Sequence, residues 1–249
     1  MTRNIWGYLF IGLAVVSVGL GIKAWNDQPA ITESLKQAVY LDKPVVSPQN
    51  EGKLIIVKGR VTTTQKVYDK RFKLELDTPY AARFGAVSRR VKKDGKMIVE
   101  WDSVNGLQED FHGQAVLGQF VLSRDLIESI PSKTDYQNFD EEVLRQNNLY
   151  GSEDSGQYWL YNDHYVTPSG KVRQIRIRYN YKPSNTDMTI VGTQQGNTII
   201  AGDSLHFVRE GIMTKEAIVK EQESFTPVAL GCGIATIFFL GLGIRKLKR

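Results

Sequence analysis

The sequence predicts an α+β protein in which a β-rich extracytoplasmic domain lies between two transmembrane helices. Uncharged apolar runs occupy residues 5–22 and 227–244, and each is about as long as the hydrocarbon core of a bilayer is thick. Between them, short apolar and alternating segments are separated by turn residues, which is typical of β-strands. The 249 residues are enough for one sizeable domain in addition to the spans.

The first apolar run, residues 5–22, is predicted to be an uncleaved transmembrane helix. Arg3 precedes the run and Lys23 follows it, and the run is longer than the apolar core of a usual signal peptide. A cleaved signal peptide is the alternative, because Ser17-Val18-Gly19 could serve as its cleavage site.

The second apolar run, residues 227–244, is followed directly by a basic tail at residues 245–249. Positive charge immediately beside the spans is concentrated at the two ends of the chain, so the positive-inside rule places both termini in the cytoplasm. The segment between the spans is then on the other side of the membrane. The tail could also contact anionic lipid head groups through Arg245, Lys246, Lys248 and Arg249.

Both apolar runs carry small residues spaced four apart, a pattern that allows helices to approach closely in lipid. It predicts that the two spans pack together or that protomers pair, whereas the alternative is that small residues are simply common in spans. The residues concerned are Ser17, Gly21, Ala229, Gly231, Gly233 and Ala235.

The net charge of +5 does not indicate a nucleic-acid partner. Arg3 and the basic tail supply five positive charges, which leaves 27 basic and 27 acidic residues in the rest of the chain. Nucleic-acid binding requires a clustered basic surface, and a neutral domain does not predict one. The one cysteine, Cys232, lies in the second apolar run, which excludes an intramolecular disulfide and a cysteine-based zinc site in the domain.

Between the spans, the chain is predicted to divide into a connector at residues 23–49, a β-rich domain at 50–205 and a helical stalk at 206–226. In the connector, Thr32 is expected to cap a short helix that ends before Pro44.

The β-rich domain contains several strand and turn patterns. Asp94-Gly95 suits the centre of a tight hairpin, because both central residues of such a turn need positive φ. Ser123 is expected to cap a brief helix that Pro131 ends, and a second helix is expected over residues 139–147. Strands are expected at residues 53–58, 60–64, 115–122, 158–166, 171–181, 188–193 and 198–201.

The order of several segments resembles that of the transmembrane protein 43 (LUMA) family. The similarity lies in EGKLIIVKG, the Asp69 and Phe72 pair, a basic strand that ends at Trp101, AVLGQFVLS, GKVRQIRIRYNY and TIVGTQQGN. The resemblance implies a large non-cytoplasmic domain and a non-catalytic role in membrane organisation, with partners in the same membrane. The animal members have several spans after the domain, where this chain has one apolar run, so functions of the extra spans are not implied.

The sequence predicts no catalytic, cofactor-binding or metal-binding residues. Three histidines, His112, His164 and His206, lack the spacing of a metal site, and no phosphate-binding loop or nucleophile elbow is present. His164 shares a strand face with Leu160 and Val166, so we expect it to be partly buried and hydrogen-bonded.

Arg173, Arg176 and Arg178 form a basic ridge on one predicted strand. The ridge predicts contact with anionic head groups or an acidic partner, and the alternative is a solvated strand face that protects a sheet edge. Nearby aromatic residues could form a platform, or could be ordinary strand formers.

Three functional hypotheses remain open at this point. The first is a membrane-anchored scaffold that contacts the lipid bilayer and associates with itself or with other membrane proteins. The second is an exported hydrolase that uses carboxylates or His164. The third is a ligand-sensing module that signals through its two spans and changes the accessibility of Cys232.

Overall fold

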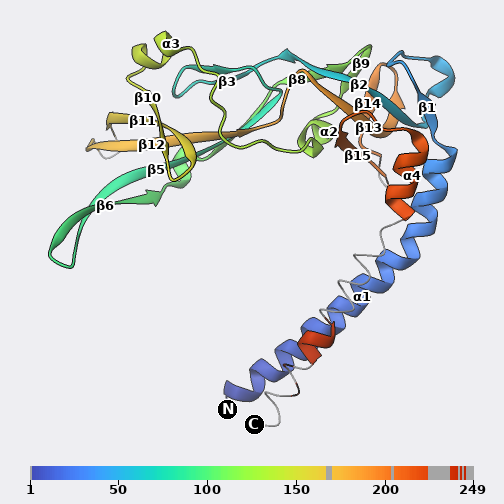
Figure 1. Ribbon diagram of the computed structural model, residues 1–249, viewed down its shortest axis with the longest axis horizontal. Helices are drawn as coiled ribbons and strands as arrows, with labels where there is room; N and C mark the ends of the chain where they lie inside the picture. Colours follow the sequence, from blue (N-terminus) through green and yellow to red (C-terminus); the bar gives the residue numbers. More distant parts are fainter. Residues whose placement is uncertain are drawn as a thin grey trace. The chain divides into compact units, whose positions relative to one another are not determined.

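The computed structural model describes residues 2–166, 170–202, 205–223, 236–240, 242 and 244 (Figure 1). In the first helix, side chains are described for residues 8–18, 22 and 29–37. The chain divides into two compact units, a helical one formed by Met1–Tyr40 and Met213–Arg249 and a β-rich one formed by Leu41–Ile212. The α+β class with a β-rich domain is therefore confirmed.

The helical unit is built on the long helix α1 (Thr2–Gln37), which passes through Pro29. The expectation that residues 23–49 form a connector with a separate short helix is therefore wrong for its first part. Proline removes one backbone hydrogen bond, but Pro29 is exposed, and continuing the helix beyond it buries Leu35 completely.

Helix α4 (Lys215–Glu223) packs against the end of α1. The Lys36 ammonium lies 2.9 Å from a carboxylate oxygen of Glu223, and Lys215 Nζ donates to the Ala38 carbonyl oxygen at 2.7 Å. Ile218 is buried within this unit. The helical stalk predicted at residues 206–226 is thus shorter than expected, because its first residues form a strand.

Within the part of the chain that the structure describes, no helix combines the length and the apolar character that crossing a membrane requires. Most of the predicted second span lies outside the described residues. So do the basic tail, with Arg245, Lys246, Lys248 and Arg249, and the small residues Ala229, Gly231, Gly233 and Ala235. The arrangement of two transmembrane helices therefore stays a prediction.

Ser17 and Gly21, the other residues of the predicted helix-packing pattern, both lie in α1. The Ser17 hydroxyl donates to the Leu13 carbonyl oxygen at 2.9 Å, so it is satisfied within its own helix. The Phe10 ring stacks on Phe239, with the ring centroids 6.3 Å apart. The first helix and the segment around Phe239 are therefore in contact within the helical unit, through phenylalanine rings. The role of the small residues stays a prediction.

A seven-stranded sheet forms one half of the β-rich unit, in the order β1-β2-β8-β9-β14-β13-β15. The division between the two units falls on β1. Because β13 also pairs with β2, the strands β2, β8, β9, β14 and β13 form a closed circuit of hydrogen-bonded neighbours. The strand bounds are β1 (Val39–Leu41), β2 (Leu54–Gln65), β8 (Gln114–Leu117), β9 (Phe120–Leu122), β13 (Thr186–Gln195), β14 (Thr198–Ile200) and β15 (Phe207–Glu210).

One local prediction in this half is confirmed, and the structure changes two others. Ser123 caps α2 (Arg124–Ser129), its hydroxyl accepting from the Leu126 amide at 3.5 Å. The apolar run at residues 115–122 is a hairpin of β8 and β9 instead of one strand, because Gly118 turns the chain with φ of +59°. The predicted helical stalk starts farther along the chain than residue 206, because Phe207–Glu210 forms strand β15. This strand alternates in burial and pairs with β13.

A six-stranded sheet forms the other half, with the path β10-β11-β12-β5-β6 and β7 paired to β5. The hairpin predicted at Asp94-Gly95 is confirmed, and these residues have φ of 50° and 78°. Two short strands, β3 (Val67–Asp69) and β4 (Leu74–Leu76), pair with each other, and the helix expected near Phe139 is α3 (Glu141–Gln146). The other bounds are β5 (Tyr80–Lys93), β6 (Lys96–Ser103), β7 (Glu109–His112), β10 (Tyr150–Asp154), β11 (Gln157–Val166) and β12 (Val172–Tyr181), with short 3₁₀ helices at Pro48–Asn50 and Asn105–Leu107.

The alternation of β12 gives this sheet an inner and an outer face. Ile175, Ile177 and Tyr179 are buried on the inner face, in a core that β3, β4 and α3 also supply. Because successive strand residues point to opposite faces, Arg176 and Arg178 lie on the outer face. The hydrophobic core therefore lies on one side of the sheet and the basic residues of β12 on the other.

Candidate functional site

On the inner face, Arg83 of β5 organises a buried polar network. Its side chain is 1% exposed and pairs with the Asp69 carboxylate, which is fully buried. Arg83 Nη2 donates to a Glu109 carboxylate oxygen at 2.8 Å, and Nε donates to the Leu107 carbonyl oxygen at 3.1 Å. Each nitrogen of the guanidinium thus has an acceptor within the protein, so this network stabilises the fold and leaves no free nitrogen for a ligand.

Tyr179 completes the network by donating from its hydroxyl to Asp69 Oδ2 at 2.6 Å. Burial first, and then the negative charge of Asp69, raises the pKa of Tyr179 well above its ordinary value. The phenol therefore stays protonated and keeps its role as a donor to the buried carboxylate.

On the outer face, the Arg176 guanidinium lies between two indole rings. Its central carbon is 4.6 Å from the ring centroid of Trp101 and 4.2 Å from that of Trp159. Arg178 lies 5.0 Å from the Trp159 ring on the same face. A carboxylate oxygen of Asp154 lies 2.7 Å from Arg176 Nη1. We call Arg176, Arg178, Trp101 and Trp159 the arginine–tryptophan face.

Strand register explains why these residues meet. Trp159 is on β11 beside β12, and Trp101 is on β6, where it pairs with Ser88 of β5. Tyr161 extends the aromatic surface, its ring centroid 5.8 Å from that of Trp101. Nε of Arg176 and Nε of Arg178 are buried and have no hydrogen-bond partner among the described residues. The described residues therefore leave these two buried donors without an acceptor.

A cleft opens in the sheet where β12 separates from β5. The two strands last pair at Ile175 and Val87, after which β5 continues with β6 alone to Lys93. The cleft has a volume of about 650 Å³, and its lining comprises Ser88, Arg89, Arg90, Val99, Asp163, Val172, Arg173 and Gln174.

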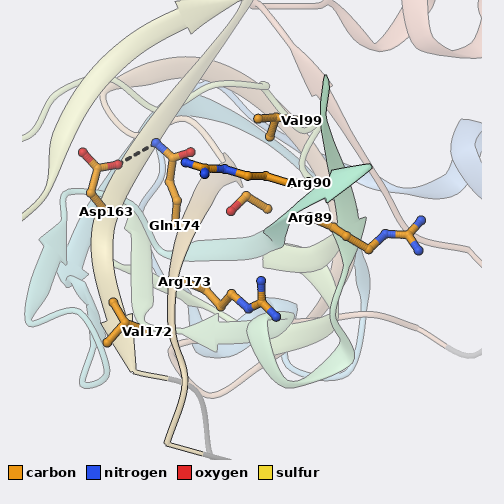
Figure 2. Close-up of a pocket in the computed structure, with 8 residues that line it drawn as sticks. Arg89, Arg90, Val99, Asp163, Val172, Arg173 and Gln174 are labelled. Atoms are coloured by element: carbon orange, nitrogen blue, oxygen red, sulfur yellow. Dashed lines mark hydrogen bonds between the residues drawn. The ribbon is translucent and has the colours of Figure 1, made fainter. Parts of the chain in front are cut away.

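The arginines of the cleft differ in their partners. Arg89 pairs with Glu100 and Asp102 of β6 at 3.2 and 3.1 Å. Neither Arg90 nor Arg173 has a hydrogen-bond or ion-pair partner in the described part of the chain. Figure 2 shows Arg90 reaching from β5 across the cleft, and Arg89 pointing the other way. Two of the three guanidiniums are therefore free to bind a ligand.

A second cavity of about 430 Å³ adjoins the cleft, because both are lined by Ser88, Arg89 and Arg173. Unlike the cleft, it has several apolar lining residues: Val87, Val104, Leu107 and Tyr165. Arg71 also lines it, and burial together with the nearby charge of Arg83 lowers the pKa of Arg71.

Comparison with known families identifies the chain at this point. The family model described as "Transmembrane protein 43" matches residues 103–244, which is more than half of the sequence. The chain belongs to the transmembrane protein 43 family. No curated protein and no solved structure matches it. The family resemblance expected from the sequence is thus confirmed.

The region shared with the transmembrane protein 43 family contains β12 and β11, and so the arginine–tryptophan face except Trp101. The basic stretch of β5, with Arg89 and Arg90, precedes the matched region. One wall of the cleft therefore lies within the family match and the other lies before it.

The structure places the three arginines of the predicted basic ridge in two different locations. It brings Arg176 and Arg178 together on the outer face and places Arg173 at the cleft. For Arg176 and Arg178 the alternative of a solvated face at a sheet edge is wrong, because β12 lies between β11 and β5 there and these side chains are only 17% and 23% exposed. The sequence showed the aromatic residues of β11 but not that Trp101 would join them from a distant strand.

The predicted environment of His164 is wrong, because its side chain is exposed. The register of β11 with β12 shifts between Asn162 and Tyr165, and this bulge interrupts the alternation that would have placed His164 beside Leu160. The His164 amide donates to the Asn162 side-chain oxygen at 2.9 Å.

The other two histidines lie in separate places. His112 Nε2 is 2.5 Å from a guanidinium nitrogen of Arg124 and its Nδ1 is 3.7 Å from Glu128, whereas His206 Nδ1 is 3.1 Å from the Gly202 carbonyl oxygen. Among the residues that the structure describes, no group of three or more metal-ligating side chains converges.

Proposed function

We propose that this member of the transmembrane protein 43 family is a non-catalytic, membrane-anchored protein that organises membrane components through its β-rich domain. In this proposal both termini lie in the cytoplasm and the domain lies on the other side of the membrane. The domain binds a second copy of the chain or another protein of the same membrane.

The observation that carries the proposal is the arginine–tryptophan face. Arginine and tryptophan are the residues that most often dominate the energy of protein–protein interfaces. Arg176 is already held between two indole rings, so binding a partner requires little further ordering of its long side chain.

Photo-crosslinking from the rim of the face tests the proposal. A photoreactive residue in place of Tyr150, which is 46% exposed and stacks on Tyr161, should capture a second copy or a membrane protein in native membranes. The same residue in place of Tyr68, which is 50% exposed on β3, is the matched control. Arg176→Glu should abolish the product from position 150, because it places a negative charge beneath the rings.

The proposal fails if no product depends on position 150 and the purified protein is monomeric and without partners. For the exported-hydrolase alternative, none of the three histidines lines the cleft or the second cavity, whereas the carboxylates of Asp163 and Asp102 do. The sensor alternative depends on Cys232, which lies outside the described residues.

A further inference from the structure

The second cavity adjoins the hydrophobic core on the inner face of the sheet. Val87, Val104 and Tyr165, which line it, are half-buried and pack against that core, and Leu107 in its wall is buried. The space has a volume of about 430 Å³, which is in the range of small-molecule sites. An apolar group placed there would remove these side chains further from water, which is favourable.

The Arg71 guanidinium is held at this cavity by contacts that leave one of its edges unused. Its central carbon is 5.2 Å from the centroid of the Tyr165 ring, and its Nη1 donates to the Gly106 carbonyl oxygen. Both Tyr165 and Gly106 line the cavity. Nε and Nη2 of Arg71 have no acceptor among the residues that the structure describes. These two nitrogens form a planar fork that matches the two oxygens of a carboxylate.

The charges of the lining favour an anionic ligand over a neutral one. Among the described residues that line the cavity, the one carboxylate is that of Asp102, and it pairs with Arg89 at 3.1 Å. Arg173 also lines the cavity and has no ion-pair partner in the described part of the chain. It lies opposite Tyr165 in the ladder of β11 and β12, so its side chain leaves the sheet on the same face as the Tyr165 ring. The positive charges of Arg71 and Arg173 are therefore not balanced within the lining.

Two carboxylates outside the lining act on Arg71, but both are already paired. Asp69 and Glu109 each bind the guanidinium of Arg83. Burial first, and then the positive charge of Arg83, lowers the pKa of Arg71, so its charged form is less favoured here than in water. An anion at the unused edge of Arg71 would offset both effects.

We propose that the second cavity binds an aliphatic monocarboxylate. The unused edge of Arg71 receives both oxygens of the carboxylate, and the chain lies against Val87, Val104 and Leu107. One fork pairs with two oxygens, so a single carboxylate satisfies the site. The cavity is on the inner face of the sheet and the arginine–tryptophan face is on the outer face, so the ligand does not occupy the surface proposed for a partner.

Photoaffinity labelling of the full chain in native membranes tests the site. The probe is an octanoate that carries a diazirine at the end of its chain, and mass spectrometry identifies the labelled residues after digestion. We expect the label on residues that line the cavity, and octanoate should displace it. Octanol lacks the charge and acetate lacks the chain, so each should compete less well by about tenfold or more. From butanoate to octanoate, each added methylene should improve competition by up to about fourfold.

Variants test the two parts of the site separately. Arg71→Gln should reduce labelling of the lining by about tenfold or more, because it removes two charge-assisted hydrogen bonds. Arg71→Lys should give an intermediate loss, because it keeps the charge without the fork. Val104→Phe should also reduce labelling, because the larger side chain fills space that the aliphatic chain needs. Arg145→Gln is the matched control, since Arg145 is an exposed arginine of α3 that pairs with Glu142 at 2.7 Å, and it should leave labelling unchanged.

Equal denaturation midpoints for the parent and the variants will show that the variants fold normally. Labelling of the lining that octanoate displaces and that depends on Arg71 supports the site. Labelling confined to residues outside the cavity, equal competition by octanol and octanoate, or equal labelling of Arg71→Gln and Arg145→Gln overturns it. Crosslinking at the arginine–tryptophan face involves neither Arg71 nor the second cavity, so the two proposals can fail separately.

Discussion

Arg83 and Arg176 lie on neighbouring strands of one sheet, yet the protein surrounds them differently. Arg83, on the inner face, has a carboxylate or carbonyl acceptor at each guanidinium nitrogen and is almost completely buried. Arg176, on the outer face, has one carboxylate and two indole rings, and its Nε has no partner among the described residues. Arg90, in the cleft, has neither kind of contact with the residues that the structure describes.

The comparison teaches how to separate arginines that support the fold from those available for binding. A buried guanidinium without acceptors would strongly destabilise the protein, so full pairing indicates a structural role. Flat contact with aromatic rings orders a guanidinium and leaves its edges free. Substitutions should therefore affect stability most at the inner face and least in the cleft.

The largest effect is expected for Asp69→Ala. The substitution removes the carboxylate that pairs with the buried Arg83 guanidinium, so we expect the free energy of unfolding to fall by about 3–5 kcal/mol. Urea denaturation of the full chain in detergent, followed by tryptophan fluorescence, measures the change. Asp187→Ala, which removes an exposed pair with Arg60, is the control and should lower it by less than about 1 kcal/mol. Equal losses in the two variants would contradict the structural role of the inner network.

A smaller effect is expected for Tyr179→Phe. Loss of the hydrogen bond to the Asp69 carboxylate should lower the free energy of unfolding by about 1.5–3 kcal/mol at neutral pH.

The same variant should also change the response to alkaline pH. The folded-state pKa of Tyr179 is raised, so its contribution to stability is complete below the unfolded-state pKa of about 10 and is lost as pH rises towards the folded-state pKa. Denaturation midpoints measured between about pH 8 and 11 should therefore fall less steeply in the variant. Parallel curves for the two proteins would show that Tyr179 does not carry this dependence.

The smallest effect is expected for Arg176→Lys. Lysine keeps the positive charge near Asp154 but loses the planar contact with Trp101 and Trp159, and we expect a loss of about 0.5–2 kcal/mol. Thermal or urea denaturation measures it, with Arg89→Lys on the exposed hairpin as the control. If Arg89→Lys lowers the free energy of unfolding by as much as Arg176→Lys, the contact of Arg176 with the two indole rings does not add to stability.

Much of the β-rich unit follows from local sequence. The hairpin at Asp94-Gly95, the cap at Ser123 and the alternation of Ile175 and Ile177 depend on neighbouring residues and were predicted correctly. The sequence could not show that Asp69, Arg83 and Tyr179 would converge, because strand order, and not spacing, brings them together. It also could not show the cleft, which exists because β5 continues beyond its last pair with β12.

The predictions that failed relied on local sequence patterns, and the structure of the folded chain overrode these patterns. A connector with a separate helix capped by Thr32 was expected after the first apolar run, but the first helix continues through Pro29 and buries Leu35. His164 was expected on an alternating strand, and the bulge in β11 changed its side.

The closed circuit of strands has a consequence for how the protein folds. Its last ladder joins Leu54–Val61 of β2 to Thr186–Thr193 of β13, two segments that are far apart in the chain. During synthesis β2 emerges long before its partner and exposes an unpaired edge with the apolar side chains of Ile55, Ile56 and Val57. Closing so long a loop slows folding and prolongs the time in which the nascent chain can aggregate. The domain therefore completes its hydrogen bonding only when nearly all of it has been made.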